Sequence, residues 1–236
     1  MNIITGNTYE EISIYAKNII VENLRQHQSL LLCAATGGSP TRMYELLAEE
    51  SVSQPDLFTQ IRIIKLDEWG GVPMEYSGTC EHYLQQYVIK PFQIPDERYI
   101  SFQSNPENPK QECERINNLL IKNGPIDICI LGIGMNGHLA LNEPDLFLNP
   151  HCHVASLSEE TLQHPMLPEE DTKPGYGLTL GMADILQSKK IIILISGEKK
   201  RKITRLFLSR NITTALPASF LWLHPDVVCL VDKDAV

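Results

Sequence analysis

The chain has 236 residues, of which 43% are hydrophobic and 21% are charged, a composition typical of a globular protein with a sizeable core. Its formal net charge of −9 argues against nucleic acid as a partner, and no apolar run is long enough to span a membrane. The N-terminal segment does not resemble a secretory signal and the six cysteines form no CxxC pair, so we expect a cytoplasmic protein with reduced thiols.

The pattern of apolar residues predicts strands that alternate with helices. The first element is an amphipathic helix over residues 9–27, followed by a buried strand at 29–35 and a helix at 42–50. The later elements are a strand at 61–66, helices at 80–89 and 111–122, a strand and turn at 126–134, strands at 177–182 and 190–196, a helix at 199–208 and a strand at 227–232. This alternation predicts an α/β fold, a mostly parallel, Rossmann-like sheet with helices on both faces, and we expect residues 1–236 to form a single domain.

Residues 144–174 differ from the rest of the chain because they are polar, rich in proline and weakly periodic. Two interpretations fit this pattern. The segment is either a lid over a site or a long surface excursion that contains one short strand.

The first strand end with unusual residues is the turn at 36–40, Thr-Gly-Gly-Ser-Pro. Its glycines allow close approach of a ligand to the backbone. Ser39 is suited to cap the next helix, with Pro40 at the first helical position. A helix N-terminus attracts anions, so this turn is a candidate phosphate site. It lacks the lysine of a P-loop, and a tight strand-to-helix turn is the alternative.

The second strand end carries two adjacent acids, Asp67 and Glu68. A carboxylate at the end of a buried strand becomes a general base when burial raises its pKa. A helix cap or a surface pair of acids is the alternative interpretation.

The third strand end, residues 132–144, contains a literal GxGxxG. A dinucleotide site needs a helix directly after such a turn, and Asn142 and Pro144 argue against one, so we do not predict a nicotinamide cofactor. What remains is His138 followed five residues later by Glu143, a pairing suited to proton transfer, although a lone histidine is more often structural.

Ligands of open α/β sheets bind beyond the carboxyl ends of the strands, where these three segments would meet. Together they suit a phosphorylated substrate that undergoes proton transfer next to a carbonyl group. We predict no cofactor. We also predict no metal site, because the His151-Cys152-His153 triplet is more typical of packing in a strand than of zinc binding.

The chain resembles the glucosamine-6-phosphate deaminase/isomerase family over nearly its whole length. The resemblance is carried by TGGSP at 36–40, KLDEW at 65–69, LGIGMNGHLALNEP at 131–144 and ISGEKK at 195–200. Related 6-phosphogluconolactonases share the fold but lack the Asn-Glu-Pro of the third motif. Two further segments, GTCEHYLQQ at 78–86 and PASFLWLH at 217–224, are most similar to the galactosamine-6-phosphate isomerase/deaminase branch.

The resemblance implies roles for individual residues. Asp67 would move a proton between C2 and C1 of the opened sugar, and Glu68 would shape the site beside it. His138 would assist ring opening, oriented and charged by Glu143. The phosphate would be held by Gly37, Gly38 and Ser39 together with Lys200, with Lys199 as the adjacent alternative.

Three departures from the family pattern qualify these roles. Asn136 occupies a catalytic position where some members carry aspartate, and an amide cannot accept a proton. The segment 160–168 has no arginine for the phosphate, which leaves His164 as the stand-in. The chain ends shortly after its last strand, so we expect no allosteric site of the kind that a longer tail helps to form.

The resemblance implies conversion of galactosamine 6-phosphate to tagatose 6-phosphate and ammonia. Conversion of glucosamine 6-phosphate to fructose 6-phosphate is the alternative, since the sequence does not fix the configuration read at C4. A lactonase and a non-catalytic sugar-phosphate sensor are the more distant alternatives. The expected partner is a small phosphorylated amino sugar, without nucleic acid or membrane, and a homo-oligomer stays an open option.

Overall fold

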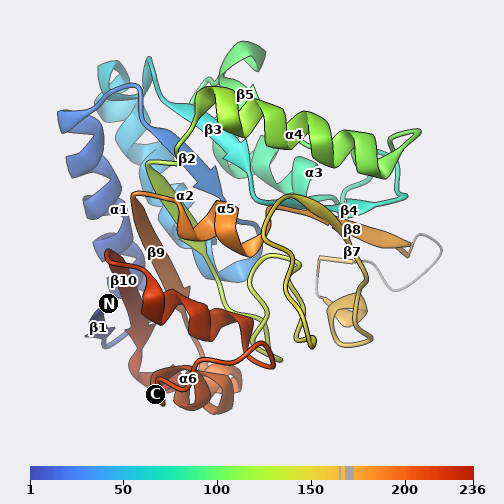
Figure 1. The fold of residues 1–236 in the computed structure, drawn as a ribbon. Helices are drawn as coiled ribbons and strands as arrows, with labels where there is room; N and C mark the ends of the chain where they lie inside the picture. The colour runs from blue at the N-terminus through green and yellow to red at the C-terminus, as the bar shows by residue number, and fades with distance from the viewer. Residues whose placement is uncertain (165, 168–172) are drawn as a thin grey trace.

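In the part of the chain that the structure describes, the central sheet is seven-stranded and entirely parallel. We describe residues 1–164, 166–167 and 173–236 from a computed structural model. The strands of this sheet are β1 (Asn2–Gly6), β2 (Leu31–Ala34), β3 (Arg62–Lys65), β5 (Tyr99–Ile100), β6 (Ile128–Leu131), β9 (Lys190–Ile195) and β10 (Val227–Asp232). Their spatial order is β1-β10-β9-β6-β2-β3-β5, which confirms the predicted α/β class (Figure 1).

In the described residues, six α-helices connect these strands and cover the sheet on both faces, as predicted (Figure 1). They are α1 (Tyr9–Gln26), α2 (Gly38–Ser53), α3 (Cys80–Leu84), α4 (Pro109–Asn123), α5 (Met182–Leu186) and α6 (Arg201–Leu208). The connections through α1, α2 and α3 step toward β5, whereas those through α4, α5 and α6 step back toward β1. Because parallel crossovers are right-handed, the two sets of helices lie on opposite faces.

The direction of the connections reverses between β2 and β6, which are neighbours in the sheet. The chain that leaves β2 crosses one face, and the chain that leaves β6 crosses the other. A crevice forms at such a switch point, beyond the carboxyl ends of the two strands.

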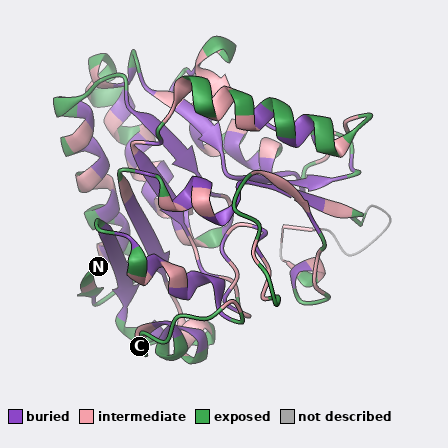
Figure 2. Ribbon diagram, in the orientation of Figure 1, coloured by how far each residue is buried: buried purple, intermediate pink, exposed green. Residues whose placement is uncertain are grey.

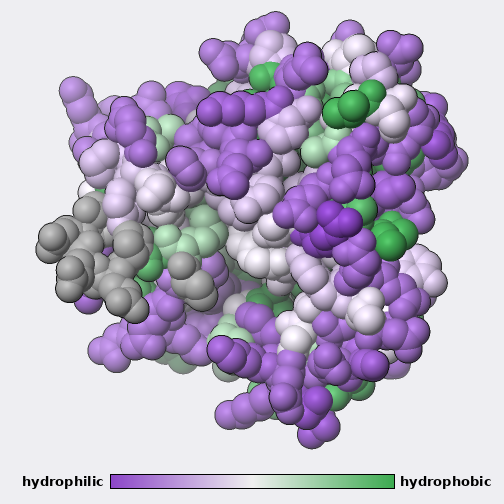
Figure 3. Space-filling view, turned by 180° about the vertical axis from the view of Figure 1, so that it is seen from behind, coloured by the Kyte–Doolittle hydropathy of each residue, from purple (hydrophilic) through white to green (hydrophobic). Residues whose placement is uncertain are grey.

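The central strands form the hydrophobic core. All residues of β2, β6 and β10 are buried, as are residues 191–195 of β9, and Figure 2 shows them between helices whose outer faces are exposed. Strands covered on both faces have no polar side, so their sequences are near-continuous apolar runs. The outer surface seen from behind is mostly hydrophilic, with hydrophobic side chains in small separate patches (Figure 3).

A second, antiparallel sheet lies beside the first, in the order β4-β8-β7. Its strands are β4 (Asp67–Gly70), β7 (His153–Ala155) and β8 (Tyr176–Thr179). The predicted strand at 177–182 was wrong in its second half, because the chain turns at Gly181 and begins α5. The predicted helix at 80–89 comprises α3 and a π-helical turn at Gln85–Ile89.

The segment 144–174 contains β7 and a short 3-10 turn at Thr161–Gln163. Residues 165 and 168–172 lie outside the described residues, so the lid stays a hypothesis. Within the described part of the chain, no helix has the length and apolar character needed to cross a membrane.

Replacing Ile192 by Ala should lower the free energy of unfolding by about 2–5 kcal/mol, because the side chain is fully buried in β9 between two neighbouring strands. Ile121→Ala is the matched control, since Ile121 is 75% exposed, and should change stability by less than about 0.5 kcal/mol. Urea denaturation followed by circular dichroism measures both. Equal losses in the two variants would contradict the placement of the core.

Candidate active site

The loops that follow β2 and β6 meet at the switch point of the sheet. A Cβ atom built at Gly132 would lie 3.5 Å from the hydroxyl oxygen of Ser39. Residues 132–143, all of them described, form turns rather than a helix, with an isolated bridge between Leu139 and Asn142. The first and third predicted strand ends therefore face each other.

The loop after β2 presents the N-terminus of α2 to this crevice. Helix α2 begins at Gly38 with Gly37 as its N-cap, so the prediction of Ser39 as the cap was wrong. The physical reason is the backbone of Gly37, whose φ of 97° favours glycine. Ser39 consequently lies within the first turn.

Hydrogen bonds from three side-chain hydroxyl groups hold this loop in place. The carbonyl of Gly37 accepts from the hydroxyls of Thr41 (2.9 Å) and Tyr83 (3.1 Å), and that of Gly38 accepts from Tyr9 (2.6 Å). The first N–H groups of a helix have no partner within the helix, and the dipole makes this end attractive to an anion. The geometry suits a phosphate group.

Asp67 begins β4, at the junction of the two sheets. Its residue is 9% exposed, and its pKa is raised from 3.8 to about 7. Burial is the main cause and the neighbouring charge of Glu68 adds to it, whereas Lys65 and the thiol of Cys80, 3.9 Å from Oδ1, act in the opposite direction. A carboxylate with a pKa near neutrality is suited to general-base catalysis.

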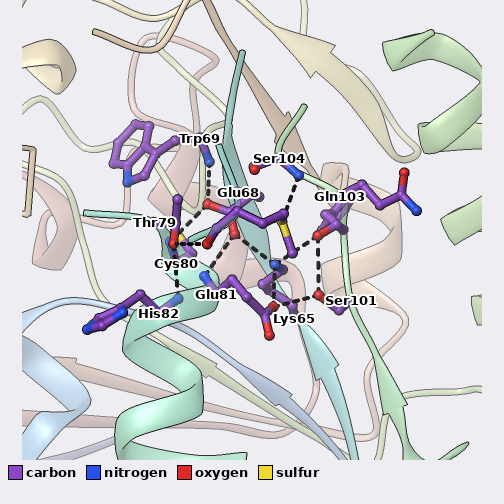
Figure 4. A network of polar contacts seen from close by, with 12 residues as sticks. Lys65, Glu68, Trp69, Thr79, Cys80, Glu81, His82, Ser101, Gln103 and Ser104 are labelled. Atoms are coloured by element: carbon purple, nitrogen blue, oxygen red, sulfur yellow. Dashed lines mark hydrogen bonds and ion pairs between the residues drawn. The ribbon is translucent and has the colours of Figure 1, made fainter. Parts of the chain in front are cut away.

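Glu68 occupies the opposite face of β4, because side chains alternate along a strand. Its Oε1 accepts from the backbone N–H groups of Trp69 and Cys80, both at 2.8 Å, and its Oε2 accepts from the N–H of Glu81 (2.8 Å) and from Lys65 (2.7 Å). Figure 4 shows these contacts. The carboxylate thereby accepts the first two N–H groups of α3, whose N-cap is Thr79, and is fully engaged with protein donors, unlike that of Asp67.

His138 and Glu143 lie together in the loop after β6, with Nδ1 of the histidine 3.6 Å from Oε2 of the glutamate. The imidazole packs on Gly134, where an added Cβ would come within 2.4 Å of the ring. Asn136 donates its amide to Glu143 Oε2 (2.7 Å), and its Oδ1 accepts from the backbone N–H of His138 (3.1 Å). Asn136 therefore fixes the positions of the pair, and its amide does so without accepting or releasing a proton.

The pKa of Glu143 is lowered to about 2. Burial alone would raise it, but the nearby imidazole of His138 and hydrogen bonds from Thr161 and Asn136 favour the charged form. The second oxygen, Oε1, accepts from Ser158 Oγ (3.2 Å) and from the hydroxyl of Thr161. Sequence reasoning missed Ser158 and Thr161, which tie the segment 144–174 to the site, because hydroxyl residues in a polar segment carry no distinctive signal.

Lys200 and His164 complete the surroundings of the crevice. Lys200 donates to the carbonyl of Ile133 (2.6 Å), whereas Lys199 is exposed, so Lys200 is the lysine at the site. The ring of His164 lies 3.8 Å from the position of a Cβ at Gly37. Its pKa is lowered to about 4, first by burial and then by the charges of His138 and Lys200.

Two chains of contacts connect Asp67 with the other groups. The hydroxyl of Thr36, which precedes Gly37, donates to the thiol of Cys80 (3.4 Å), and that thiol contacts Asp67. On the other side, Asp67 pairs with Thr179 of β8, whose hydroxyl accepts from the N–H of Leu141 (3.2 Å), within the loop that carries His138 and Glu143. The structure thus brings together all the predicted site residues.

The His151-Cys152-His153 triplet serves local contacts. His151 pairs with Asp184 (2.8 Å), and His153 contacts the carbonyl of His151 (2.9 Å). Among residues 1–164, 166–167 and 173–236, no three histidine, cysteine or acidic side chains are grouped so as to hold a metal ion.

The loop after β2, the buried carboxylate and the His–Glu pair, gathered at the switch point of a parallel sheet, are suited to an α/β enzyme that acts on a phosphorylated substrate. Residues 7–229 match the model of the family described as glucosamine-6-phosphate isomerases/6-phosphogluconolactonase, and the chain belongs to that family.

The relatives are full-length matches. AgaI of Escherichia coli K12, named as a candidate deaminase, is 40% identical over 224 residues, which cover 95% of this chain and 89% of AgaI. A glucosamine-6-phosphate deaminase of Shouchella clausii KSM-K16 is 33% identical over a match that covers 100% of this chain and 96% of that enzyme. The solved structure of a monomeric glucosamine-6-phosphate deaminase is 34% identical, with a TM-score of 0.95 over 100% of this chain and 98% of that one. These likenesses support an enzyme of this family and confirm the expected fold.

Replacing Asp67 by Asn should stabilise the protein above pH 7, because the ionised carboxylate is unfavourable where it is buried. The folded pKa of about 7 exceeds the ordinary value of 3.8, so the destabilisation accumulates as the pH rises from about 4 to 7 and persists above it. The gain should reach a few kcal/mol, at ~1.4 kcal/mol per pKa unit, and vanish near pH 4.

Melting temperatures at pH 4.5 and pH 8 measure this effect, with Asp56→Asn, at an exposed position, as the control. A stability difference between D67N and the wild type that is the same at both pH values would contradict the raised pKa.

Proposed function

We propose that the protein is a hexosamine-6-phosphate isomerase/deaminase that converts galactosamine 6-phosphate and water to tagatose 6-phosphate and ammonia. The observation that carries the proposal is the buried Asp67 carboxylate, with a pKa of about 7, beside an anion-binding helix N-terminus and a His–Glu pair. A base near neutrality is what removal of a proton next to a carbonyl-like carbon requires.

In this mechanism the phosphate supplies binding energy remote from the reacting carbons. The backbone of Gly38 and Ser39 and the ammonium of Lys200 hold it, and His164, in contact with the same loop, adds a further polar group. Fixing the phosphate places C1 and C2 of the sugar at the other end of the site.

His138, oriented by Glu143, assists opening of the pyranose ring by proton transfer at the ring oxygen. Asp67 then removes the C2 proton, which gives an enolamine, and returns a proton to C1 on the same face. Water hydrolyses the resulting C2 imine, so that the nitrogen leaves as ammonia and the ketose remains. Asn136 positions Glu143 and takes no proton in this scheme.

The choice of the galacto sugar rests on the resemblance of the segments 78–86 and 217–224 to the galactosamine-6-phosphate branch, which supports the branch more than the substrate itself, and both segments flank the site. The first contributes Cys80 and Glu81, which surround Asp67 and Glu68, and the second contributes Ala218, whose N–H donates to the carbonyl of Gly137 (3.0 Å) beside His138. Glucosamine 6-phosphate is the second candidate, favoured by the relatives that are named for this substrate at 33–34% identity.

The test is ammonia release and ketose formation from the two hexosamine 6-phosphates side by side. We expect both products from galactosamine 6-phosphate, with a higher kcat/KM than from glucosamine 6-phosphate. The reverse preference would agree with the mechanism but contradict the choice of galactosamine 6-phosphate as the substrate. Ammonia from neither sugar would contradict the function, and hydrolysis of 6-phosphogluconolactone would then identify a lactonase.

Asp67→Asn should lower kcat by about 10²–10⁴-fold, because an amide cannot accept the C2 proton. His138→Gln should cause a smaller loss, since part of the sugar opens spontaneously in water. Coupled assays of ammonia measure both, with Glu107→Gln at an exposed position as the control. Undiminished turnover in folded D67N protein would remove Asp67 from the mechanism.

A further inference from the structure

A fully buried ammonium group lies behind the carboxylate of Asp67. Lys65 ends β3, and its side chain is 0% exposed. Its three N–H donors are all engaged, by Glu68 Oε2 (2.7 Å), Glu81 Oε2 (2.8 Å) and the carbonyl of Phe102 (3.0 Å), as Figure 4 shows. The ammonium is therefore fixed in one position.

The second carboxylate in contact with Lys65 is as well satisfied as the first. Glu81 Oε2 also accepts from the hydroxyls of Tyr99 (2.8 Å) and Ser101 (2.7 Å), and Oε1 accepts from the amide of Gln85 (2.8 Å). Burial would raise the pKa of Glu81, but Lys65 and these donors lower it to about 2. Lys65, Glu68 and Glu81, called here the Lys65 cluster, thus hold one positive and two negative charges.

Buried ion pairs seldom stabilise a fold more than apolar side chains of similar volume, so stability alone does not account for the Lys65 cluster. Its position suggests another effect. Glu68 follows Asp67 directly in β4, and Cys80 joins the two, since its N–H donates to Glu68 (2.8 Å) and its thiol contacts Asp67 (3.9 Å). The net charge of the cluster therefore acts on Asp67 through a dry, low-dielectric region.

We propose that Lys65 is a positioning residue that keeps a large share of the Asp67 carboxylate ionised near neutral pH, and so available as a base, by offsetting the negative charge of Glu68. The inference rests on the proposed function of Asp67. Lys65 touches no substrate in this scheme and acts only through Asp67.

The charged and titratable groups that act on Asp67 come from four elements. Glu68 lies on its own strand, Lys65 comes from β3, the thiol of Cys80 from α3 and the thiol of Cys33 from β2. Burial raises the pKa of both thiols well above 9.0, so they stay neutral near pH 7. Of these four groups, Lys65 alone is a cation. It lowers the pKa of Asp67, whereas burial and Glu68 raise it.

Two substitutions change the charge of the Lys65 cluster in opposite directions. Lys65→Met adds one net negative charge, and Glu81→Gln removes one. The Glu81→Gln variant retains its contacts, because the glutamine oxygen can accept from Lys65, Tyr99 and Ser101 while the amide of Gln85 rotates to face the new N–H₂ group. The double variant has the wild-type net charge.

The experiment has two measurements. The first is the acid limb of the plot of kcat/KM against pH for the hexosamine phosphate. The second, which does not depend on turnover, is the titration of the Asp67 carboxyl group. The titration is followed by ¹³C NMR of the carboxyl carbon, assigned by its loss in D67N. We expect the midpoint to rise by about one pH unit in K65M, to fall in E81Q, and to return to the wild-type value in the double variant. If K65M does not fold, comparison of E81Q with the double variant tests the effect of Lys65, because the two differ only at residue 65.

An Asp67 titration at the same pH in all variants would overturn the inference, as would shifts in one common direction, which indicate general loosening of the fold. If the NMR midpoints shift as expected and the acid limb does not, the effect of Lys65 on Asp67 stands and Asp67 is removed from the proposed mechanism. The failure of the inference and that of the proposed function are thereby distinguished.

Discussion

Burial of the Asp67 carboxylate at the junction of two sheets is the constraint on which the arrangement of the site depends. Pairing of β4 with β8 removes this side chain from water, which favours its protonated form. A carboxyl group in such a place would hold its proton too firmly to act as a base at neutral pH unless a positive charge lay nearby. In our proposal the surrounding residues exclude water from Asp67, and Lys65 supplies the positive charge through its ion pair with Glu68.

The order of the strands accounts for the other half of the site. Because the crossovers reverse between β2 and β6, the anion-binding loop and the His138–Glu143 loop lie side by side although about a hundred residues separate them in the chain. The small sheet then connects Asp67 to the same loop through Thr179 and Leu141. In the proposed mechanism, phosphate binding, ring opening and proton transfer therefore take place between loops that the two sheets hold together, which suits a reaction that depends on close positioning.

Much of this arrangement could be predicted from the sequence, because it depends on local patterns. The apolar runs that became β2, β6, β9 and β10 indicated a parallel sheet, and the three strand ends indicated the residues of the site. Contacts between distant segments could not be predicted. The partners of Lys65 come from β4, α3 and the chain after β5, and a lysine at the end of an apolar run gives no sign of them. The edge strand β1 was missed because it is short and half exposed, and the start of α2 was misplaced because a glycine with positive φ replaced the expected serine cap.

The central claim is that one phosphorylated amino sugar spans the crevice, with its phosphate on the α2 N-terminus and its C2 atom beside residue 67. A crystal structure of the D67N protein soaked with galactosamine 6-phosphate tests this directly, because the variant should bind the sugar and turn it over slowly. The account predicts the phosphate within hydrogen-bonding distance of the N–H groups of Gly38 and Ser39 and of Lys200, with C2 in contact with the side chain of residue 67. A phosphate bound elsewhere, or a sugar whose C2 atom lies away from residue 67, would contradict the account.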